Sequence, residues 1–516
     1  MNPIELGLFS GRINAICAEM GAVLQRSALS PNIRDRLDFS CALFDATGEL
    51  LGQAAHIPVH LGSMAYAMRD LVSRCDWEMG SMVVLNDPFQ GGTHLPDVTL
   101  IAPLFIDHQL IAFVVNRAHH AHIGAVTPGS MPLSTTLEEE GVLLSPQRLL
   151  RNGAIDEPLF ESLMAKLGHN QQSRGDFQAQ VSANRIGLQR LQQRVTQMGL
   201  AAFDEAGVAL NRYGERLARQ TIAAMADGCY RFSDQLDSDG VGDQPLRLQV
   251  AVTIAGEQME VDFNGSAPEC RGNLNAPLSV AAAGVYYLFR CLMATDTPAC
   301  GGIFRPVAIK APAGSLLNAN APAAVAAGNV ETSTRVVDLV AGALAQVVPD
   351  KMAAASHGSM NNVAMGSRHP SYPPWDYYET LGGGMGAGAT GGGVSGRHTH
   401  MTNTLNTPIE VVEQNYPLRV SEYRLRRHSG GEGVRRGGDG VVRSYTFLQP
   451  AEVTLLTERR HSSPWGLQGG GEGCRGENAL NGELLPDKCQ LTVQAGDKLT
   501  IATPGGGGWG VCDAKT

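Results

Sequence analysis

Asp87-Pro88-Phe89-Gln90-Gly91-Gly92-Thr93-His94-Leu95-Pro96-Asp97 opens the stretch of sequence that decides how the first part of this chain folds. Two apolar runs with the composition of strands follow it, residues 98–106 and 110–115. Asp107-His108-Gln109 is the expected turn between them. In an antiparallel pair, the residues that open the first strand lie opposite those that close the second. The hairpin therefore predicts that Asp97 faces residue 118 or 119.

The second run leads into a cluster of histidines, Asn116-Arg117-Ala118-His119-His120-Ala121-His122, in a chain with only 14 histidines. Pairing across the hairpin brings one of them to Asp97, and His94 lies three residues before Asp97. Imidazole and carboxylate together form a ligand set that suits Zn²⁺, Mn²⁺ or Fe²⁺. The sequence thus predicts a divalent-metal site at one end of the hairpin. The geometry does not choose among the three histidines of the cluster.

A further metal ligand could come from Asp35, Asp38 or Asp45. Asp38 stands at the mouth of a predicted strand, which makes it the natural choice. The alternative for Asp38 is a salt bridge with Arg34 or Arg36. The residues alone leave both explanations open.

Two more histidines, His56 and His60, have the i, i+4 spacing of a helical metal pair. Pro58 lies between them and disfavours a continuous helix. We therefore expect a loop pair near the site, with His60 lining it, rather than two metal ligands.

Proton transfer has several candidate groups close to the histidine cluster. Glu139 and Glu140 belong to an acidic run that follows it, and either could act as a general base or hold a ligand in place. The imidazole of His120 or His122 could also move a proton. The commoner explanation of such an acidic run is a solvated turn.

One long helical segment carries Asp176, Gln180 and Asn184 at i, i+4 and i+8, on a single helix face. The simplest interpretation of this face is a solvated polar stripe. The alternative is that the three side chains line a site.

The chain has 516 residues, of which 43% are hydrophobic and 17% charged, and its net charge is −10. This composition is typical of a soluble globular protein. The negative balance argues against a nucleic-acid surface, and the basic run 424–436 is expected to be a solvated or anion-contacting loop. There is no signal-peptide pattern and no run of 18 apolar residues, so no membrane association is expected. The ten cysteines include no C-x-x-C pair, which indicates reduced thiols and a cytoplasmic location.

The expected fold class is α+β. We expect a mixed α/β N-terminal lobe that carries the metal-site hairpin and a long helical segment, followed by a β-rich, glycine-rich C-terminal lobe. The elements expected in the first lobe are helices 4–29 and 61–75, a hairpin from residue 39, a strand at 82–85 and helices through 157–227. Those in the second are strands 246–254 and 258–263 and helices 278–294 and 333–348. The domains are placed at 1–228 and 229–516.

Glycine-rich segments at 381–396, 469–476 and 505–508 suggest phosphate binding, but the detailed pattern excludes it. The sequence has no G-x-x-x-x-G-K-[ST] and no dinucleotide-binding fingerprint in the required context. The glycines from Gly382 to Gly393 are expected to let backbone approach backbone or ligand. There is also no Gly-x-Ser-x-Gly nucleophile motif. Nucleotide hydrolysis or covalent catalysis by this chain alone is therefore not expected.

Several blocks, spread from about residue 30 to 510, resemble the hydantoinase B/oxoprolinase family. They are residues 32–40, 56–64, 86–97, 175–180, 402–404, 429–433 and 503–508. Their order and number make a chance match untenable. One departure is Cys300, where many members of the family have Asn; it bears on substrate identity and not on the metal motif.

The resemblance implies a cytoplasmic hetero-oligomer with a hydantoinase A-type partner, which would bind ATP with Mg²⁺. It implies a divalent metal, with Zn²⁺ or Mn²⁺ favoured, and the ligands that it implies are Asp38, His94, Asp97 and His119. His119 is thereby favoured over the other two histidines of the cluster. The helical face with Asp176, Gln180 and Asn184 becomes a candidate for substrate lining.

The expected function is the ring-opening subunit of an ATP-dependent cyclic amide hydrolase, acting on a hydantoin, N-methylhydantoin or 5-oxoproline. One alternative is a subunit of an ATP-dependent ketone carboxylase, since acetone and acetophenone carboxylase subunits are related to the family. Those subunits are generally longer than 516 residues, which favours the hydrolase. The other alternative is a non-catalytic scaffold with a structural metal.

Overall fold

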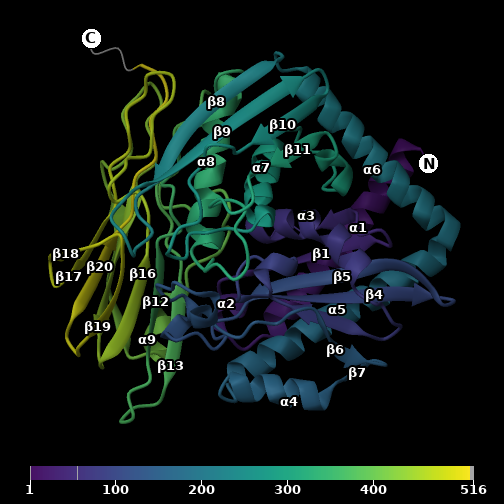
Figure 1. Ribbon diagram of the computed structural model, residues 1–516, viewed down its shortest axis with the longest axis horizontal. Helices are drawn as coiled ribbons and strands as arrows, with labels where there is room; N and C mark the ends of the chain where they lie inside the picture. Colours follow the sequence, from purple (N-terminus) through teal and green to yellow (C-terminus); the bar gives the residue numbers. More distant parts are fainter. Residues whose placement is uncertain (1, 55, 512–516) are drawn as a thin grey trace.

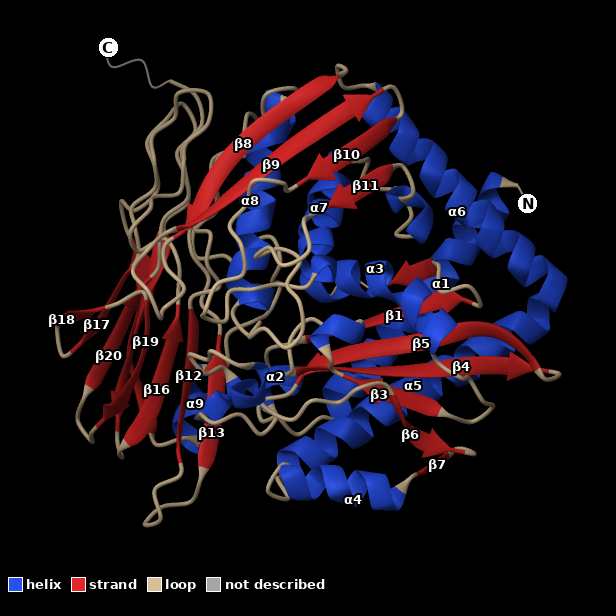
Figure 2. Ribbon diagram, viewed as in Figure 1, coloured by secondary structure: helices blue, strands red, loops and turns tan. Residues whose placement is uncertain are grey.

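The computed structural model of this chain describes residues 2–54 and 56–511 (Figures 1 and 2). Its helices are α1 (Pro3–Ser27), α2 (Pro31–Arg34), α3 (Pro58–Arg74), α4 (Glu157–Lys166), α5 (Gln171–Met198), α6 (Leu200–Ala223), α7 (Leu278–Leu292), α8 (Ser333–Leu344) and α9 (Ile409–Asn415). Four separate sheets accompany them, so the expected α+β class is confirmed.

The first sheet has the strand order β2-β1-β5-β4-β3-β6-β7, and all its neighbours are antiparallel. Its strands are β1 (Phe39–Asp45), β2 (Leu50–Gln53), β3 (Met82–Leu85), β4 (Asp97–Ile106), β5 (Gln109–His119), β6 (Gln147–Arg151) and β7 (Ala154–Ile155). The long β4–β5 hairpin lies at its centre, as Figure 2 shows. The site predicted at the end of this hairpin is therefore in the middle of the sheet and not at an edge.

The β4–β5 hairpin has the register that the sequence predicted. Its turn consists of Asp107 and His108 alone, because β5 already begins at Gln109. Both turn residues have positive φ, 48° and 63°, as in the two-residue turns that match the twist of paired strands. Asp97 pairs directly with His119, so the predicted pairing with residue 118 or 119 is confirmed.

The layers of the N-terminal part follow from the two faces of the first sheet. Helices α1 and α5 cover one face, and α3 covers the other (Figure 1). Helix α7 packs on α3, α8 packs on α7, and α8 supports a second sheet of order β11-β10-β9-β8. The strands of that sheet are β8 (Gly228–Leu236), β9 (Leu246–Ala255), β10 (Gln258–Asp262) and β11 (Val307–Lys310). The end of the hairpin is thus covered by segments from beyond residue 228.

The helices differ from the sequence-based expectation at their ends. Helix α3 begins at Pro58, because proline suits the first turn of a helix. His60 therefore lies in a helix, and its expected position in a loop was wrong; His56 precedes the helix. The long helical segment is divided into α4, α5 and α6, and Gly199 separates the last two with φ 83°. The change from helix to strand falls at Gly228, as expected.

The C-terminal part is a sandwich of two antiparallel sheets, with strand orders β13-β12-β16-β19 and β14-β15-β20-β17-β18. Its strands are β12 (Asn362–Ser367), β13 (Trp375–Glu379), β14 (Leu418–Arg426), β15 (Gly440–Phe447), β16 (Ala451–Leu456), β17 (Glu477–Leu480), β18 (Glu483–Leu485), β19 (Lys488–Val493) and β20 (Lys498–Ala502). A core of its own fills the space between them. The largest core includes residues from both sides of position 228, and the division into two domains stays a prediction.

The glycine-rich segments pack against one another beside this sandwich, and loops from the last part of the chain are the yellow ones at the upper left of Figure 1. Backbone hydrogen bonds join them; Gly384 N–H donates to the Pro504 carbonyl and Gly506 N–H to the Gly438 carbonyl, each at 3.0 Å. A Cβ atom at Gly506 would lie 2.1 Å from the carbonyl oxygen of Met385. The expectation that glycine lets backbone approach backbone is confirmed. Separately, none of the described helices is long and apolar enough to span a bilayer.

Candidate metal centre

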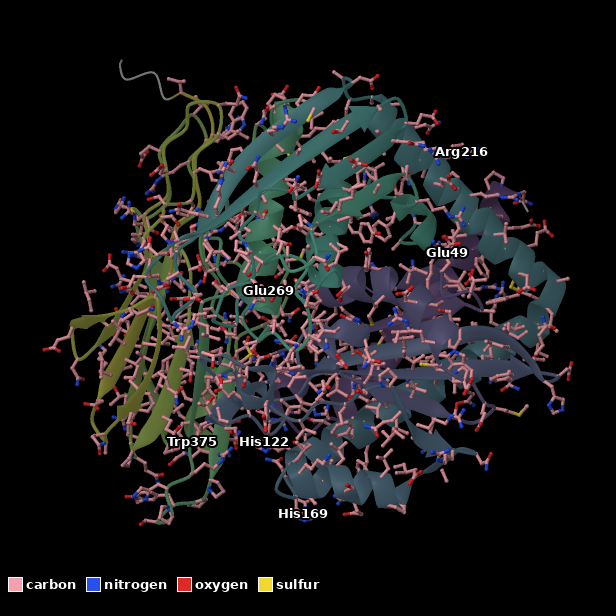
Figure 3. The ribbon with its side chains drawn as sticks, viewed as in Figure 1. Glu49, His122, His169, Arg216, Glu269 and Trp375 are labelled. Atoms are coloured by element: carbon pink, nitrogen blue, oxygen red, sulfur yellow. The ribbon has the colours of Figure 1, made fainter. Side chains whose placement is uncertain are left out.

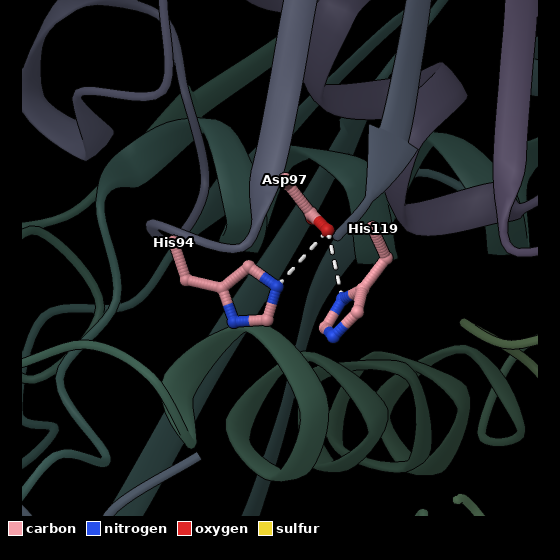
Figure 4. A group of neighbouring side chains, drawn as sticks. All are labelled: His94, Asp97 and His119. Carbon is pink, nitrogen blue, oxygen red and sulfur yellow. Dashed lines mark hydrogen bonds and ion pairs between the residues drawn. The ribbon is translucent and has the colours of Figure 1, made fainter. Parts of the chain in front are cut away.

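Asp97 is the centre of a buried cluster at the end of the hairpin (Figure 4). Its Oδ1 lies 3.0 Å from Nε2 of His94 and 3.1 Å from Nδ1 of His119. One ligand atom from each of these three residues lies within 4.8 Å of the other two. All three side chains are almost completely buried. This is the group that sequence pattern and hairpin register placed together.

The side chain of Asn86 fixes the loop that precedes β4 and carries His94. The Asn86 side chain donates to the carbonyls of Leu95 and Val142 and accepts the N–H of Leu144. Within the loop, Asp97 N–H donates to the His94 carbonyl at 3.1 Å. The position of His94 is therefore set by the backbone and not by the metal-binding side chains alone.

Three further donors hold the other carboxylate oxygen of Asp97. Thr93 Oγ1 donates to Oδ2 at 2.8 Å, His60 Nε2 lies 3.1 Å away and Asn329 Nδ2 lies 3.2 Å away. Burial would raise the pKa of Asp97, but His60, His94 and His119 outweigh burial and hold it well below its ordinary value. Asp97 is therefore an anion surrounded by donors, as a metal-binding carboxylate requires.

The two histidines of the cluster, His94 and His119, differ in their surroundings. Burial lowers the pKa of His94, but the charge of Asp97 and hydrogen bonds to Asp97 and the Ala326 carbonyl raise it above its ordinary value. For His119 burial dominates and lowers the pKa, so its ring is the neutral form that binds metals. Its ring stacks on Tyr378 at 4.8 Å, and its Nε2 is buried without a hydrogen-bond partner in the described part of the chain. These features fit a divalent cation.

Asp38, the fourth ligand that the resemblance implies, lies beside this group and not within it. Its carboxylate is 4.0 Å from His60 Nε2 and 3.8 Å from Arg36 Nη2. Its backbone carbonyl accepts the N–H of His119 at 3.0 Å. The geometry agrees with both earlier alternatives, a ligand and a partner of Arg36, and the ligand role stays a prediction.

Sequence reasoning missed Asn329, which touches two members of the group. Its Nδ2 lies 3.0 Å from His94 Nε2 as well as 3.2 Å from Asp97 Oδ2. Asn329 lies in a π-helix, Gly328–Thr332, directly before α8. Such π-helical turns often occur at functional sites. A single asparagine far along the sequence from the hairpin gives no local signal that could have revealed it.

The polar face of α5 is buried, so the interpretation as a solvated stripe was wrong. Asp176 accepts the N–H groups of Leu29 and Ser30, at the start of α2. Gln180 Nε2 donates to the Val98 carbonyl at 2.8 Å, and Asn184 Nδ2 donates to the Leu100 carbonyl at 3.0 Å. These bonds fasten α5 to β4. A substrate-lining role for the three residues stays a prediction.

The four candidate proton-transfer residues differ in their burial and in their contacts. His120 Nε2 is 2.9 Å from Gln180 Oε1, and its Nδ1 has no partner among the described residues. His122 lies outside the cluster. Its Nδ1 is 3.7 Å from Asp376 Oδ2, and it lies near Trp375, the first residue of β13 (Figure 3). Glu139 accepts the N–H groups of Thr135 and Thr136 in an exposed turn. No catalytic role is assigned by these contacts.

Glu140 is buried, so the solvated turn ends before it. Its Oε1 accepts Ser134 Oγ–H at 2.8 Å and the N–H groups of Val325 and Ala326 at 2.8 and 2.9 Å. The carbonyl of the same Ala326 lies 3.1 Å from His94 Nδ1. Glu140 is therefore linked to His94 through one residue, Ala326, and does not touch the cluster itself.

Comparison with known proteins decides the family. The hydantoinase B/oxoprolinase family model matches residues 2–512. The chain belongs to the hydantoinase B/oxoprolinase family. The resemblance predicted from the sequence blocks is thus confirmed over almost the whole chain.

Two relatives show the range of chain lengths in the hydantoinase B/oxoprolinase family. Over 98% of its length, this chain is 38% identical to 5-oxoprolinase 1 of Arabidopsis thaliana, but it covers only 42% of that protein. It is also 31% identical to a protein from Pseudomonas sp. (strain NS671) whose name describes it as one subunit of a D-/L-hydantoinase. That match covers 99% of this chain and 90% of the Pseudomonas protein. The chain thus spans about two fifths of the longer relative.

Two solved structures share the fold of this hydantoinase B/oxoprolinase chain. The ATP-dependent caprolactamase from Pseudomonas jessenii superimposes with a TM-score of 0.92 at 25% identity, over 99% of this chain and 91% of that chain. Nucleotide-free acetone carboxylase has a TM-score of 0.88 at 18% identity, over 99% and 76%. The second similarity shows a common fold.

Glu140→Gln is expected to change how stability depends on pH. Burial raises the pKa of Glu140 from 4.5 to about 7. Between these values the unfolded chain binds fewer protons than the folded chain, so stability falls as pH rises, by about 3 kcal/mol at most. Glutamine keeps all three bonds at Oε1 and removes this loss. The melting temperature of the variant, relative to wild type, should be higher at pH 8 than at pH 5; an equal difference at both pH values contradicts the prediction.

Proposed function

We propose that this chain is the metal-containing subunit of an ATP-dependent cyclic amide hydrolase that opens a hydantoin, N-methylhydantoin or 5-oxoproline ring. The observation that carries the proposal is the buried group of Asp97, His94 and His119, in a chain of the hydantoinase B/oxoprolinase family. The caprolactamase similarity supports a cyclic amide as the substrate class. The nine described cysteines are all free, which supports a reducing, cytoplasmic compartment.

A hydantoinase A-type subunit is the proposed partner. The sequence has no phosphate-binding loop motif, so ATP with Mg²⁺ would bind to another chain. The length of the Arabidopsis relative supports this arrangement, since more than half of that protein has no counterpart here. The Pseudomonas relative is named as one subunit of its enzyme, which also implies a partner. The active complex would then be a hetero-oligomer.

The roles of the residues follow from their contacts. Asp38, His94, Asp97 and His119 would hold the divalent ion, with Zn²⁺ or Mn²⁺ favoured by the ligand set. Such an ion polarises a carbonyl group or lowers the pKa of a water molecule. The Ala326 carbonyl, 3.1 Å from His94 Nδ1, would accept the ring proton there, so that Nε2 would be the atom that binds the ion. Thr93 and His60 orient the Asp97 carboxylate.

Activation of the ring and movement of protons complete the proposal. Unstrained cyclic amides are poor electrophiles, and the partner would use ATP to phosphorylate the ring carbonyl oxygen. His120 is a candidate for moving a proton because its Nδ1 is buried and unpartnered among the described residues, while Gln180 fixes its Nε2. His122, Glu139 and Glu140 are the other candidates for this role.

Co-expression with a hydantoinase A-type subunit tests the proposal. The purified complex should hydrolyse at least one ring of a panel of hydantoin, N-methylhydantoin, 5-oxoproline and caprolactam, only with ATP present. Metal content should be measured on the same preparation. Absence of ATP-dependent turnover on the whole panel, in a complex that contains metal, would sink the proposal.

The fold similarity to acetone carboxylase supports a second candidate, a subunit of an ATP-dependent ketone carboxylase. ATP turnover that requires bicarbonate and a ketone would favour it. A scaffold with a structural metal is the third candidate. Removal of the metal by a chelator distinguishes it. Loss of a structural ion should lower the melting temperature of the protein, whereas loss of activity at an unchanged melting temperature would argue against a scaffold.

A further inference from the structure

Asn329 is held rigidly against the metal-type cluster by the π-helix around it. A Cβ at Gly328 would lie 1.9 Å from the Asn275 carbonyl oxygen, so only glycine permits this close approach. Thr332 Oγ1 donates to the Leu274 carbonyl at 2.6 Å. Glu331 Oε1 accepts the Met360 N–H at 2.9 Å. The Asn329 side chain therefore projects from a fixed backbone.

The amide group of Asn329 is only half satisfied. Its Nδ2 faces His94 Nε2 and Asp97 Oδ2, as described above. Its Oδ1 is buried and has no hydrogen-bond partner in the described part of the chain, and the residue is 2% exposed. A buried acceptor without a partner costs about 1–3 kcal/mol, so such atoms usually have a role. The free oxygen lies on the same amide that reaches the proposed metal ligands.

The hydrogen on Nδ2 that faces His94 also becomes available under the proposed function. His94 Nδ1 lies 3.1 Å from the Ala326 carbonyl, so with a cation at Nε2 the ring would keep its proton on Nδ1 and give the Nε2 lone pair to the ion. Once that lone pair binds a cation, it no longer accepts from Asn329. One N–H and the C=O of Asn329 would then both be available to a ligand, while Asp97 Oδ2 keeps the other N–H.

We propose that Asn329 is the residue that recognises the ring amide of the substrate, by donating from Nδ2 to the ring carbonyl and accepting the ring N–H at Oδ1. A primary amide and a cis amide are complementary, because each offers a donor and an acceptor on one edge. A small ring forces its amide to be cis. An open-chain secondary amide is trans by about 2.5–4 kcal/mol, so its C=O and N–H point to opposite sides. Asn329 thus selects cyclic amides with a free N–H.

The test compares N–H rings with their N-methyl counterparts, which lack the donor. The complex with its partner subunit is titrated without ATP, using 5-oxoproline against N-methyl-5-oxoproline and caprolactam against N-methylcaprolactam. For the ring that wild type hydrolyses, methylation should weaken binding by at least about 10-fold, since it leaves Oδ1 unpaired. Asn329→Ala should weaken binding of the N–H ring by about 10-fold or more and change that of the N-methyl ring by less than about threefold.

Asn211→Ala is the matched control, since Asn211 is a buried asparagine on α6 that accepts the Gly302 N–H and is not a member of the cluster. It should leave the ratio of the two affinities unchanged. Metal content of each protein is measured in parallel and should not differ. Because the inference rests on the proposed function, the two can fail separately. A wild-type complex that hydrolyses no ring overturns both. An active wild type that binds both rings equally, or an Asn329→Ala variant that loses both equally or loses its metal, overturns the role of Asn329 alone.

Discussion

Asp97→Asn is expected to lower ATP-dependent ring hydrolysis by about 10³-fold or more, because a metal centre contributes several kcal/mol of transition-state stabilisation. The substitution keeps the size of the side chain and removes the charge that His94 and His119 share. An amide in this place cannot accept from all of its present donors, so the cluster loses its anion. Turnover of the complex and its metal content measure the effect, and both should fall together.

Asp87→Asn is the control for this prediction. Asp87 lies on the same loop and is also nearly buried, but its carboxylate serves a short turn, where it accepts the Phe89 N–H at 3.0 Å and the Gln90 side-chain amide at 2.6 Å. Its variant should keep full metal content and activity within about threefold of wild type, as substitutions away from a site usually do. An Asp97→Asn complex with full metal content and more than a tenth of wild-type activity would contradict the proposed centre.

Lys488→Met is expected to lower the free energy of unfolding by about 3–5 kcal/mol, the usual cost of removing one member of a buried ion pair. The Lys488 ammonium is completely buried and lies 2.7 Å from Glu458 Oε1 and 3.0 Å from Asp487 Oδ2. Both carboxylates raise the pKa of Lys488 above its ordinary value although burial lowers it. Chemical denaturation of the chain, alone or in its complex, measures the loss.

Lys498→Met is the matched comparison in the same part of the molecule. Lys498 is 46% exposed, and its ammonium is 3.8 Å from Glu422. Exposed pairs of this kind contribute about 0–1 kcal/mol, so this variant should be almost as stable as wild type. If the two methionine variants lose equal stability, the buried network around Glu458 does not have the strength that its geometry indicates.

The central hairpin could be predicted from the sequence because its determinants are local. A short turn and two runs of β-forming residues fix the register, and the register alone places Asp97 opposite His119. The helix periodicity of α1, α5 and α6 was equally informative. The expected start of α3 was wrong because Pro58 was taken as a barrier, whereas the structure uses it in the first helical turn.

The rest of the site could not be predicted, because it depends on contacts between distant segments. Asn329 approaches from a π-helix, and Tyr378 stacks on His119 from β13. The burial of Asp176, Gln180 and Asn184 likewise depends on how α5 lies across β4. Periodicity identifies a polar helix face, but it does not say whether water or another strand covers that face.

In the glycine-rich segments beside the sandwich, surface exposure is a poor guide to which positions tolerate substitution. Mutational tolerance is normally highest at exposed positions, because added atoms extend into solvent. Here Gly470 and Gly393 are only partly buried, yet a Cβ would lie 2.2 Å from the Gly508 carbonyl oxygen at the first and 1.9 Å from that of Met385 at the second. A library that randomised surface residues would thus meet intolerant positions in loops with no assigned helix or strand, because an added side chain there would collide with neighbouring backbone.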